Sequence, residues 1–201
     1  MQNSFALDKL LFLKAIGYKF IDHSSLNLAQ NFIFQNLDEL KKEISSCSLC
    51  YLKNGSDSAF AGDGEIGAKI LLISFSSSQI KNETEAIKSG LNLSKDEFYA
   101  SCILRCENDK NTPNECVQMC KPYLFQEINL LKPKLIITLG ANTLFSLMPE
   151  LKNSDINAIR GSLLKFANTN LIPTFSPAWL SKNPSFKADF QNDLKKIKTM
   201  L

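Results

Sequence analysis

The sequence contains only one histidine, a small excess of positive charge and no long uninterrupted apolar run. His23, the single histidine, lies in a polar Asp-His-Ser-Ser stretch that is typical of a solvated turn, so we expect no Cys–His catalysis. No run approaches the length of a membrane span. The N-terminal segment 5–16 is interrupted by charges and lacks the basic lead and the small-residue cleavage site of a signal peptide. We therefore expect a cytoplasmic protein without a membrane partner, in a reducing compartment where disulfides are rare.

The composition is that of one globular domain, with or without an arm. Of the 201 residues, 44% are hydrophobic and 21% are charged, which is enough for an adequate core. The net charge of +3 is compatible with nucleic-acid binding but does not indicate it, because binding depends on where charges cluster. Apolar residues recur at helical spacing between Phe5 and Ile16. We expect residues 1–35 to form an N-terminal helical extension and residues 36–201 to form the main domain of a monomer. The extension either packs on the domain or is a docking arm for a partner protein.

Four of the six cysteines suggest a metal site. Cys47 and Cys50 are separated by two residues, a spacing that lets both thiolates of a turn face one metal centre. Cys106 and Cys120 complete a set of four soft ligands, which suits either tetrahedral zinc or an iron–sulfur cluster. A thioredoxin-like redox pair fits less well, because the Cys-x-x-Cys motif follows a charged helical segment and precedes a glycine-rich loop. Taken singly, each cysteine also fits a small buried hydrophobic residue.

Apolar runs alternate with helical patterns along the rest of the chain. Four runs predict strands, namely 68–74, 98–104, 134–140 and 170–176. Five segments predict helices, namely 36–46, 83–89, 114–130, 141–148 and 187–201. Pro122, two residues after Cys120, predicts a change of chain direction there. The alternation indicates an α/β fold, a three-layer α/β/α sandwich with a short, mainly parallel sheet of four strands. In such sheets, ligands bind beyond the carboxyl ends of the strands.

Several short motifs occur in a defined order. They are Leu37-Asp-Glu-Leu before Cys47-x-x-Cys50, Gly62-Asp-Gly-Glu before Ala68-Lys-Ile-Leu-Leu-Ile, Phe98-Tyr99 leading to Cys106, Cys120-Lys-Pro-Tyr-Leu, Leu131-Lys-Pro-Lys-Leu-Ile-Ile-Thr-Leu-Gly-Ala, Arg160-Gly161, Thr174-Phe-Ser-Pro-Ala-Trp-Leu and Asp193-Leu194. In this order the chain resembles the family 4 uracil-DNA glycosylases, which carry a [4Fe-4S] cluster, over roughly residues 37–197. The resemblance implies that the cluster is held by Cys47, Cys50, Cys106 and Cys120. It thereby selects iron–sulfur over zinc and leaves Cys102 and Cys116 as extra cysteines.

The sequence departs from this family at the family's pocket residues. The family's Gly-Glu-Ala-Pro-Gly, whose acidic position and backbone help to place the attacking water, corresponds to 74–78, Ser-Phe-Ser-Ser-Ser. The family's Pro-Phe segment, which stacks the flipped uracil, has no counterpart between Gln79 and Leu93. An asparagine that reads the uracil edge falls on Cys102, and a histidine that stabilises the departing base falls on Ser176. The resemblance implies removal of uracil from DNA in base-excision repair, with substrate-binding positions at Ser74, Phe75, Cys102 and Ser176.

Other residues are candidates to replace the lost chemistry. A carboxylate that positions water is offered by Asp63, Glu83 or Glu85, and we name Asp63 with Ser176 as candidate catalytic residues. Solvated loop or helix-face charges are the alternative for these acids. Phe75 is a candidate to stack a base, with a place in the core as the alternative.

The segment that follows the last predicted strand is the candidate contact with single- or double-stranded DNA. Cations and backbone N–H groups hold phosphates, and an exposed aromatic ring stacks bases. The candidate residues are Arg160, Pro177, Trp179 and Lys182. Two functions stay open at this point: a DNA repair hydrolase with a rebuilt pocket, and a non-catalytic iron–sulfur module that binds nucleic acid or protein.

Overall fold

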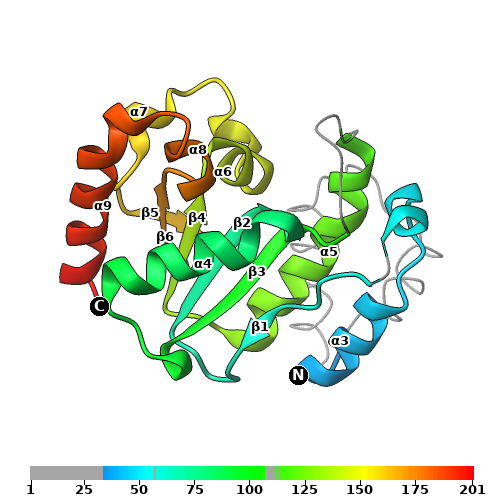
Figure 1. The fold of residues 1–201 in the computed structure, drawn as a ribbon. Coiled ribbons are helices and arrows are strands. Elements are labelled where there is room, and N and C mark those ends of the chain that lie inside the picture. The colour runs from blue at the N-terminus through cyan, green and yellow to red at the C-terminus, as the bar shows by residue number, and fades with distance from the viewer. Residues whose placement is uncertain (1–33, 57, 107–111, 113) are drawn as a thin grey trace.

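The computed structural model describes residues 34–56, 58–106, 112 and 114–201, and Figure 1 shows the fold that they form. The N-terminal extension predicted over residues 1–35 lies outside the described residues except for its last two. Within the described ranges, no helix is both long enough and apolar enough to cross a bilayer.

A six-stranded sheet runs through the centre of the molecule in the order β1-β3-β2-β4-β6-β5 (Figure 1). The strands are β1 (Asp63–Gly64), β2 (Ile70–Ser76), β3 (Phe98–Leu104), β4 (Leu135–Leu139), β5 (Leu164–Phe166) and β6 (Thr169–Thr174). The inner four, β3, β2, β4 and β6, are parallel, and they are the four strands that the apolar runs predict. Both faces of these strands are covered, which is why they read as nearly continuous apolar runs.

The predicted number of strands was wrong, because the sheet has six strands and not four. The two additional strands pair antiparallel with the outer parallel strands, β1 with β3 and β5 with β6. They have only two and three residues, so neither is long enough to produce a period-two pattern in the sequence. Their strand character comes from pairing with an exposed sheet edge.

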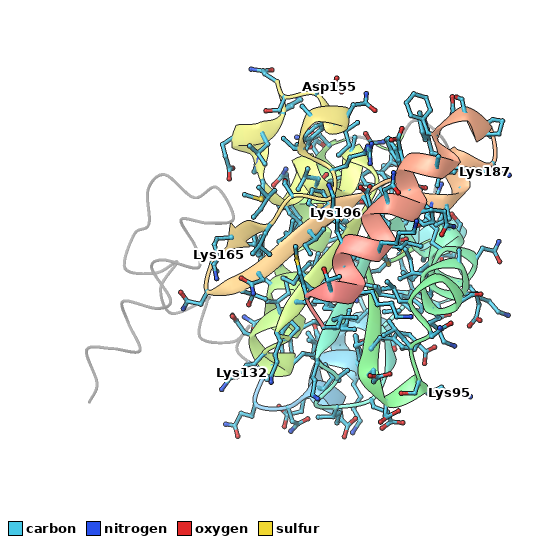
Figure 2. The ribbon with its side chains drawn as sticks, turned by 90° about the vertical axis from the view of Figure 1, so that its left-hand side faces the viewer. Lys95, Lys132, Asp155, Lys165, Lys187 and Lys196 are labelled. Atoms are coloured by element: carbon cyan, nitrogen blue, oxygen red, sulfur yellow. The ribbon has the colours of Figure 1, made fainter. Side chains whose placement is uncertain are left out.

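Helices cover the two faces of the sheet. One face carries α4 (Ser77–Leu91), α8 (Pro177–Leu180) and α9 (Lys187–Thr199), whose apolar residues share a core with β2, β4 and β6. The other face carries α3 (Leu37–Ser45), α5 (Asn114–Leu131) and α6 (Ala141–Leu147). Figure 2 shows α9, with the labelled Lys187 and Lys196, crossing the outside of the first face. The three-layer α/β/α arrangement therefore agrees with the prediction.

The remaining elements are short turns of helix. They are the α-helix α7 (Ile156–Ile159) and the 3₁₀ helices η2 (Tyr51–Gly55), η3 (Lys95–Glu97), η4 (Pro149–Leu151) and η5 (Pro184–Phe186).

Local sequence explains why α3 leads to the first cysteine pair. The Asn36 side chain accepts a hydrogen bond of 2.9 Å from the Glu39 N–H and so caps the first turn. Leu37, Leu40 and Ile44 are buried, as their spacing predicts. The helix ends just before Cys47, which places the Cys-x-x-Cys turn at its carboxyl end.

The change of chain direction predicted at Pro122 was wrong. Helix α5 continues through Pro122, although proline lacks the N–H that would bond back to the preceding turn. Buried residues on both sides of the proline, among them Val117, Leu124 and Ile128, hold the helix against the sheet. Tertiary packing therefore outweighs the local preference.

Candidate functional site

The four cysteines predicted as ligands line one cavity. Cys47 and Cys50 come from the turn after α3, Cys106 follows β3, and Cys120 lies in α5. The cavity has about 300 Å³ of empty space, part of it open to solvent, and Tyr123 and Arg105 also line it. The fold thus brings together two cysteine pairs that are far apart in the sequence.

These thiols lie close enough to affect one another's pKa. Burial is the largest cause that raises the pKa of Cys120 to about 11, and the nearby Cys50 and Cys47 contribute to the increase, whereas the Arg105 backbone N–H opposes it. Burial, followed by the same two neighbours, also raises the pKa of Cys106. Because their pKa values are raised, these thiols stay protonated unless a positive centre takes the place of the protons. A metal centre would do so, because metal ligation requires thiolates and releases protons.

The chemistry of the four sulfurs limits what they can hold. Among the described residues, no group of three or more histidine, cysteine, aspartate or glutamate side chains is arranged to hold a metal ion. A zinc ion with bonds of about 2.3 Å would require sulfur atoms only about 3.8 Å apart. Four thiols that line one cavity are a donor set that suits either zinc or an iron–sulfur cluster.

The two extra cysteines occupy different surroundings. The Cys116 thiol lies within hydrogen-bond reach of Cys50, at the edge of the cysteine cavity. Cys102 is fully buried in β3, where its thiol contacts the Leu104 carbonyl at 3.2 Å. Burial strongly raises the pKa of Cys102, so it stays a neutral thiol and is not an activated nucleophile.

A second cluster of polar side chains lies at the carboxyl ends of the parallel strands. Ser74 in β2 is the register partner of Cys102 in β3, so the two lie side by side. The Glu83 carboxylate, from α4, accepts hydrogen bonds from the Ser74 and Ser176 hydroxyls. Three of the predicted pocket residues are therefore brought together, with Glu83 between two of them. We call Ser74, Cys102, Glu83 and Ser176 the carboxylate pocket.

Backbone geometry makes this approach possible. Gly140 follows β4 with a φ of +88°, and a Cβ there would lie 3.1 Å from the Ser176 Cβ. A larger residue would therefore push Ser176 away from the strand ends. Ser176 is also the N-cap of α8, and its hydroxyl oxygen accepts a hydrogen bond of 3.2 Å from the Trp179 N–H.

Burial affects the protonation of the Glu83 carboxyl group. Its side chain is 0% exposed, and this burial raises the carboxyl pKa above the ordinary value of 4.5. Hydrogen bonds from Ser176, Ser74 and the Ala178 backbone lower the pKa in part. A carboxylate has about four acceptor positions, so one remains after these three bonds. Chemically, the pocket offers a carboxylate that can accept a proton and two hydroxyls that can donate hydrogen bonds.

Phe75 and Asp63 lie away from this pocket. Neighbouring residues of a strand point to opposite faces of the sheet. Ser74 points to α4, so Phe75 points to the other face and packs against the core beside α5. Asp63 is exposed in the edge strand β1 and pairs with Ala100. Four strand positions separate β1 from β6, which corresponds to about 19 Å. The fold does not bring Asp63 to Ser176.

Arg160 lies in an ion-pair network and not on an open surface. Its guanidinium contacts Asp193 Oδ1 at 2.7 Å and Asp189 Oδ1 at 2.6 Å, both in α9. Thr174 donates to the other Asp193 oxygen at 2.9 Å. A phosphate at Arg160 would have to compete with two carboxylates.

The other predicted DNA-contacting residues lie together at α8. Trp179 is 40% exposed, and its ring stacks on Phe175 with centroids 5.0 Å apart. The Phe186 ring also contacts Trp179, with ring centroids 5.2 Å apart. Pro177 opens the helix, and Lys182 is exposed just after it. The helix therefore presents a supported aromatic ring beside a cation.

Sequence reasoning named Glu83 only as one of three carboxylates, and it missed Arg105 and Glu127 altogether. These two form a fully buried ion pair, 2.5 Å between Nη2 and Oε2. The signal for Glu83 was its position in a helix directly after β2. No sequence signal marks Arg105 and Glu127 as partners, because they are 22 residues apart.

The fold and the site define an α/β protein with a buried carboxylate at the carboxyl ends of its parallel strands and a four-cysteine cavity beside the sheet. A model described as the uracil DNA glycosylase superfamily matches residues 58–198, and the chain belongs to this superfamily. The type-4 uracil-DNA glycosylase of Sulfurisphaera tokodaii is 27% identical over 187 residues, which is 82% of this chain and 84% of that protein. The type-4 enzyme of Saccharolobus solfataricus is 28% identical over 83% of this chain and 87% of that protein. That of Thermotoga maritima is 23% identical over 80% and 88%, respectively. The predicted resemblance to family 4 is thus confirmed.

Proposed function

We propose that the protein is a DNA glycosylase of base-excision repair, which hydrolyses the N-glycosidic bond of uracil or a related base. The observation that carries this proposal is the buried Glu83 carboxylate, hydrogen-bonded to Ser74 and Ser176 at the carboxyl ends of the strands. Membership of the superfamily supports the reaction class, and this carboxylate supplies an acid–base group at the carboxyl ends of the strands.

In the proposed reaction, Glu83 acts on the attacking water. Its free acceptor position takes a water O–H, and its negative charge stabilises the positive charge that develops on the sugar. The C1′–N bond breaks with its electron pair going to the base, and a C1′–O bond to the water forms. Glu83 takes the proton from the water, and this proton finally reaches the departed base. The Ser176 hydroxyl, which donates to Glu83 in this structure, turns to the base and becomes the donor for its negative charge.

The altered pocket predicts slow catalysis. Ser176 donates one hydrogen bond but carries no charge, and Cys102 is a weak donor that lacks the acceptor of an amide. Loss of one well-placed donor to developing charge typically costs about a hundredfold to a thousandfold in rate. Because Glu83 is buried, access for the base requires Ser176 and the short helix α8 to move aside.

We further propose that Cys47, Cys50, Cys106 and Cys120 hold a [4Fe-4S] cluster, with zinc as the alternative. The donor set and the cavity that it lines support the cluster. When bound, such a cluster crosslinks protein segments and can exchange electrons. A cluster bound here would connect the turn after α3, the segment after β3 and α5, because these are the segments that carry the four cysteines.

DNA contact is assigned to the surface at α8. Trp179 offers a stacking face, and Lys182 with the backbone around Pro177 holds phosphate. This surface lies next to Ser176, so a base held on it would be close to the carboxylate pocket.

Removal of the Glu83 charge tests the catalytic proposal. We expect Glu83→Gln to lower the rate of base release by about a hundredfold to ten-thousandfold, because the amide cannot take a proton from water. Base release is measured on single-stranded and double-stranded DNA that contains uracil, and then on other damaged bases. The matched control is Glu85→Gln, which changes an exposed residue two positions away in the same helix. Equal rates for wild type and Glu83→Gln would refute the role of Glu83.

A second candidate function is a DNA-binding iron–sulfur protein without glycosylase activity. The full burial of Ser74, Cys102 and Glu83 favours it, because a filled pocket leaves no room for a base. Its expected result is salt-sensitive DNA binding by wild type with no base released from any substrate. Iron content and visible absorption of anaerobically purified protein distinguish a cluster from zinc under either function.

A further inference from the structure

Arg105 connects the cysteine cavity to a buried ion pair. It directly precedes Cys106, and its side chain is 2% exposed. Nη2 lies 2.5 Å from Glu127 Oε2 and Nη1 lies 3.2 Å from Oε1, a bidentate arrangement. Nη1 also donates to the Phe60 carbonyl at 3.1 Å. The far end of the guanidinium is thus fixed by α5 and by the chain before β1.

Arg105 also lies against the cysteine cavity. Arg105 lines the cavity formed by the four cysteines, and its backbone N–H donates to Cys120. Its Nε is buried and has no hydrogen-bond partner among the described residues. A buried donor without a partner is unusual, because it has lost water without a replacement. An acceptor in the cysteine cavity would satisfy it.

Charge supports the same conclusion. A guanidinium stays protonated in proteins, and the two contacts with Glu127 hold this buried cation in place. Four cysteine thiolates with their metal group form an anionic centre. A fixed cation and N–H donors next to it favour the more negative, reduced form.

We propose that Arg105 is a positioning residue for the iron–sulfur cluster, with Nε–H donating to a sulfur of the cluster or its ligands and Glu127 fixing the guanidinium. This inference rests on the cluster proposed above. Arg105 is not one of the four ligands, but it helps to hold the cluster and raises the reduction potential of the cluster.

Three variants of the full-length protein, purified anaerobically, test the proposal. Arg105→Met removes the cation and the donor, so the reduction potential falls and iron is retained about 10- to 100-fold less tightly against a chelator. Arg105→Lys keeps the charge but lacks Nε and the planar fork, so iron retention falls while the potential changes less. Glu127→Gln removes the neutralising charge, so the potential rises. Potentials come from redox titration followed by electron paramagnetic resonance.

Lys121→Met is the matched control. Lys121 adjoins Cys120 in the chain, but its Nζ lies over the Phe125 ring at 5.7 Å. We expect it to shift the potential less than Arg105→Met. Opposite shifts for Arg105→Met and Glu127→Gln distinguish tuning from mere destabilisation, which would not reverse sign.

The failures can be told apart. Wild-type protein without iron would overturn the cluster itself. A cluster whose potential is the same in wild type, Arg105→Met and Glu127→Gln would overturn the role of Arg105 alone. If Arg105→Met does not fold, Arg105→Lys and Glu127→Gln decide, and an unchanged potential in Glu127→Gln would overturn the inference.

Discussion

At the scale of single residues, Glu83 combines two properties that usually exclude each other. It is completely buried, and it carries a group that must be ionised to act on water. Burial raises its pKa, and the hydrogen bonds from Ser176, Ser74 and Ala178 lower it only in part. If Glu83 acts as the base, activity should increase with pH through this raised pKa, and not through the ordinary value of a glutamate.

The raised pKa of Glu83 also predicts a pH dependence of stability. The neutral acid is favoured in the folded state, so its stabilising contribution is complete below the unfolded pKa of about 4.5. This contribution is lost as the pH rises through the raised, folded-state value. Glu83→Gln stays neutral and should not lose it. The free energy of unfolding, measured by urea denaturation from pH 4.5 upward, should therefore shift in favour of Glu83→Gln as the pH increases.

Glu85→Gln is the control for removing a carboxylate from α4, and all variants must carry the same amount of iron. A difference between wild type and Glu83→Gln that is constant with pH would contradict the raised pKa. A difference that shifts in favour of wild type would reverse its sign.

At the scale of elements, α8 links the carboxylate pocket to the surface. The helix has only four residues and is held by the Ser176 cap and by the stacking of Trp179 on Phe175. Phe175 is buried, so the exposed Trp179 ring rests on a fixed support. Such a ring loses little freedom when a base stacks on it.

Trp179→Ala should weaken binding of single-stranded DNA by about 1 to 3 kcal/mol, the range for loss of one base–aromatic stack. Fluorescence anisotropy with a labelled oligonucleotide measures this change. Leu163→Ala is the control, because Leu163 is also a large exposed apolar residue but lies before β5. Equal affinities for wild type and Trp179→Ala would remove α8 from the DNA interface.

Elements also show where local patterns suffice. The four long strands are visible as apolar runs and α3 as a helical periodicity, and the structure contains them close to the predicted positions. The strands β1 and β5 could not be predicted, because two or three residues become a strand only beside an existing edge. Pro122 predicted a change of chain direction that does not occur, because the packing of α5 outweighs the missing N–H.

At the scale of the whole molecule, the four cysteines come from three segments that also share one apolar core, on the α3 and α5 face of the sheet. The turn at Cys47 and Cys50 follows α3, whereas Cys120 lies within α5 and Cys106 at the end of β3. The inner strands are also held from the opposite face, where their side chains share a core with α4, α8 and α9 that includes none of the cysteines.

Removal of iron should therefore loosen α3 and the first half of α5 and leave β2 and β4 protected. Hydrogen–deuterium exchange with mass spectrometry, before and after treatment with a chelator and an oxidant, measures this difference. Cys120→Ser should reproduce the effect of iron removal, and Cys116→Ser, which changes an extra cysteine, should not. Uniform loosening of the whole sheet would contradict a local role for the cluster.

The sequence by itself determined the layers, the four parallel strands and the family, because apolar runs, helical periodicity and motif order are properties of the chain. It also predicted the four cysteine ligands from their spacing and from the resemblance to the family. Only the tertiary structure decided which side chains meet. It placed Glu83 between Ser74 and Ser176, paired Arg160 with Asp193, and set Arg105 against Glu127. Each of these contacts joins different elements, and strand register and helix packing fix them. No short stretch of sequence encodes strand register or helix packing, so only the folded chain shows which groups meet in the pocket.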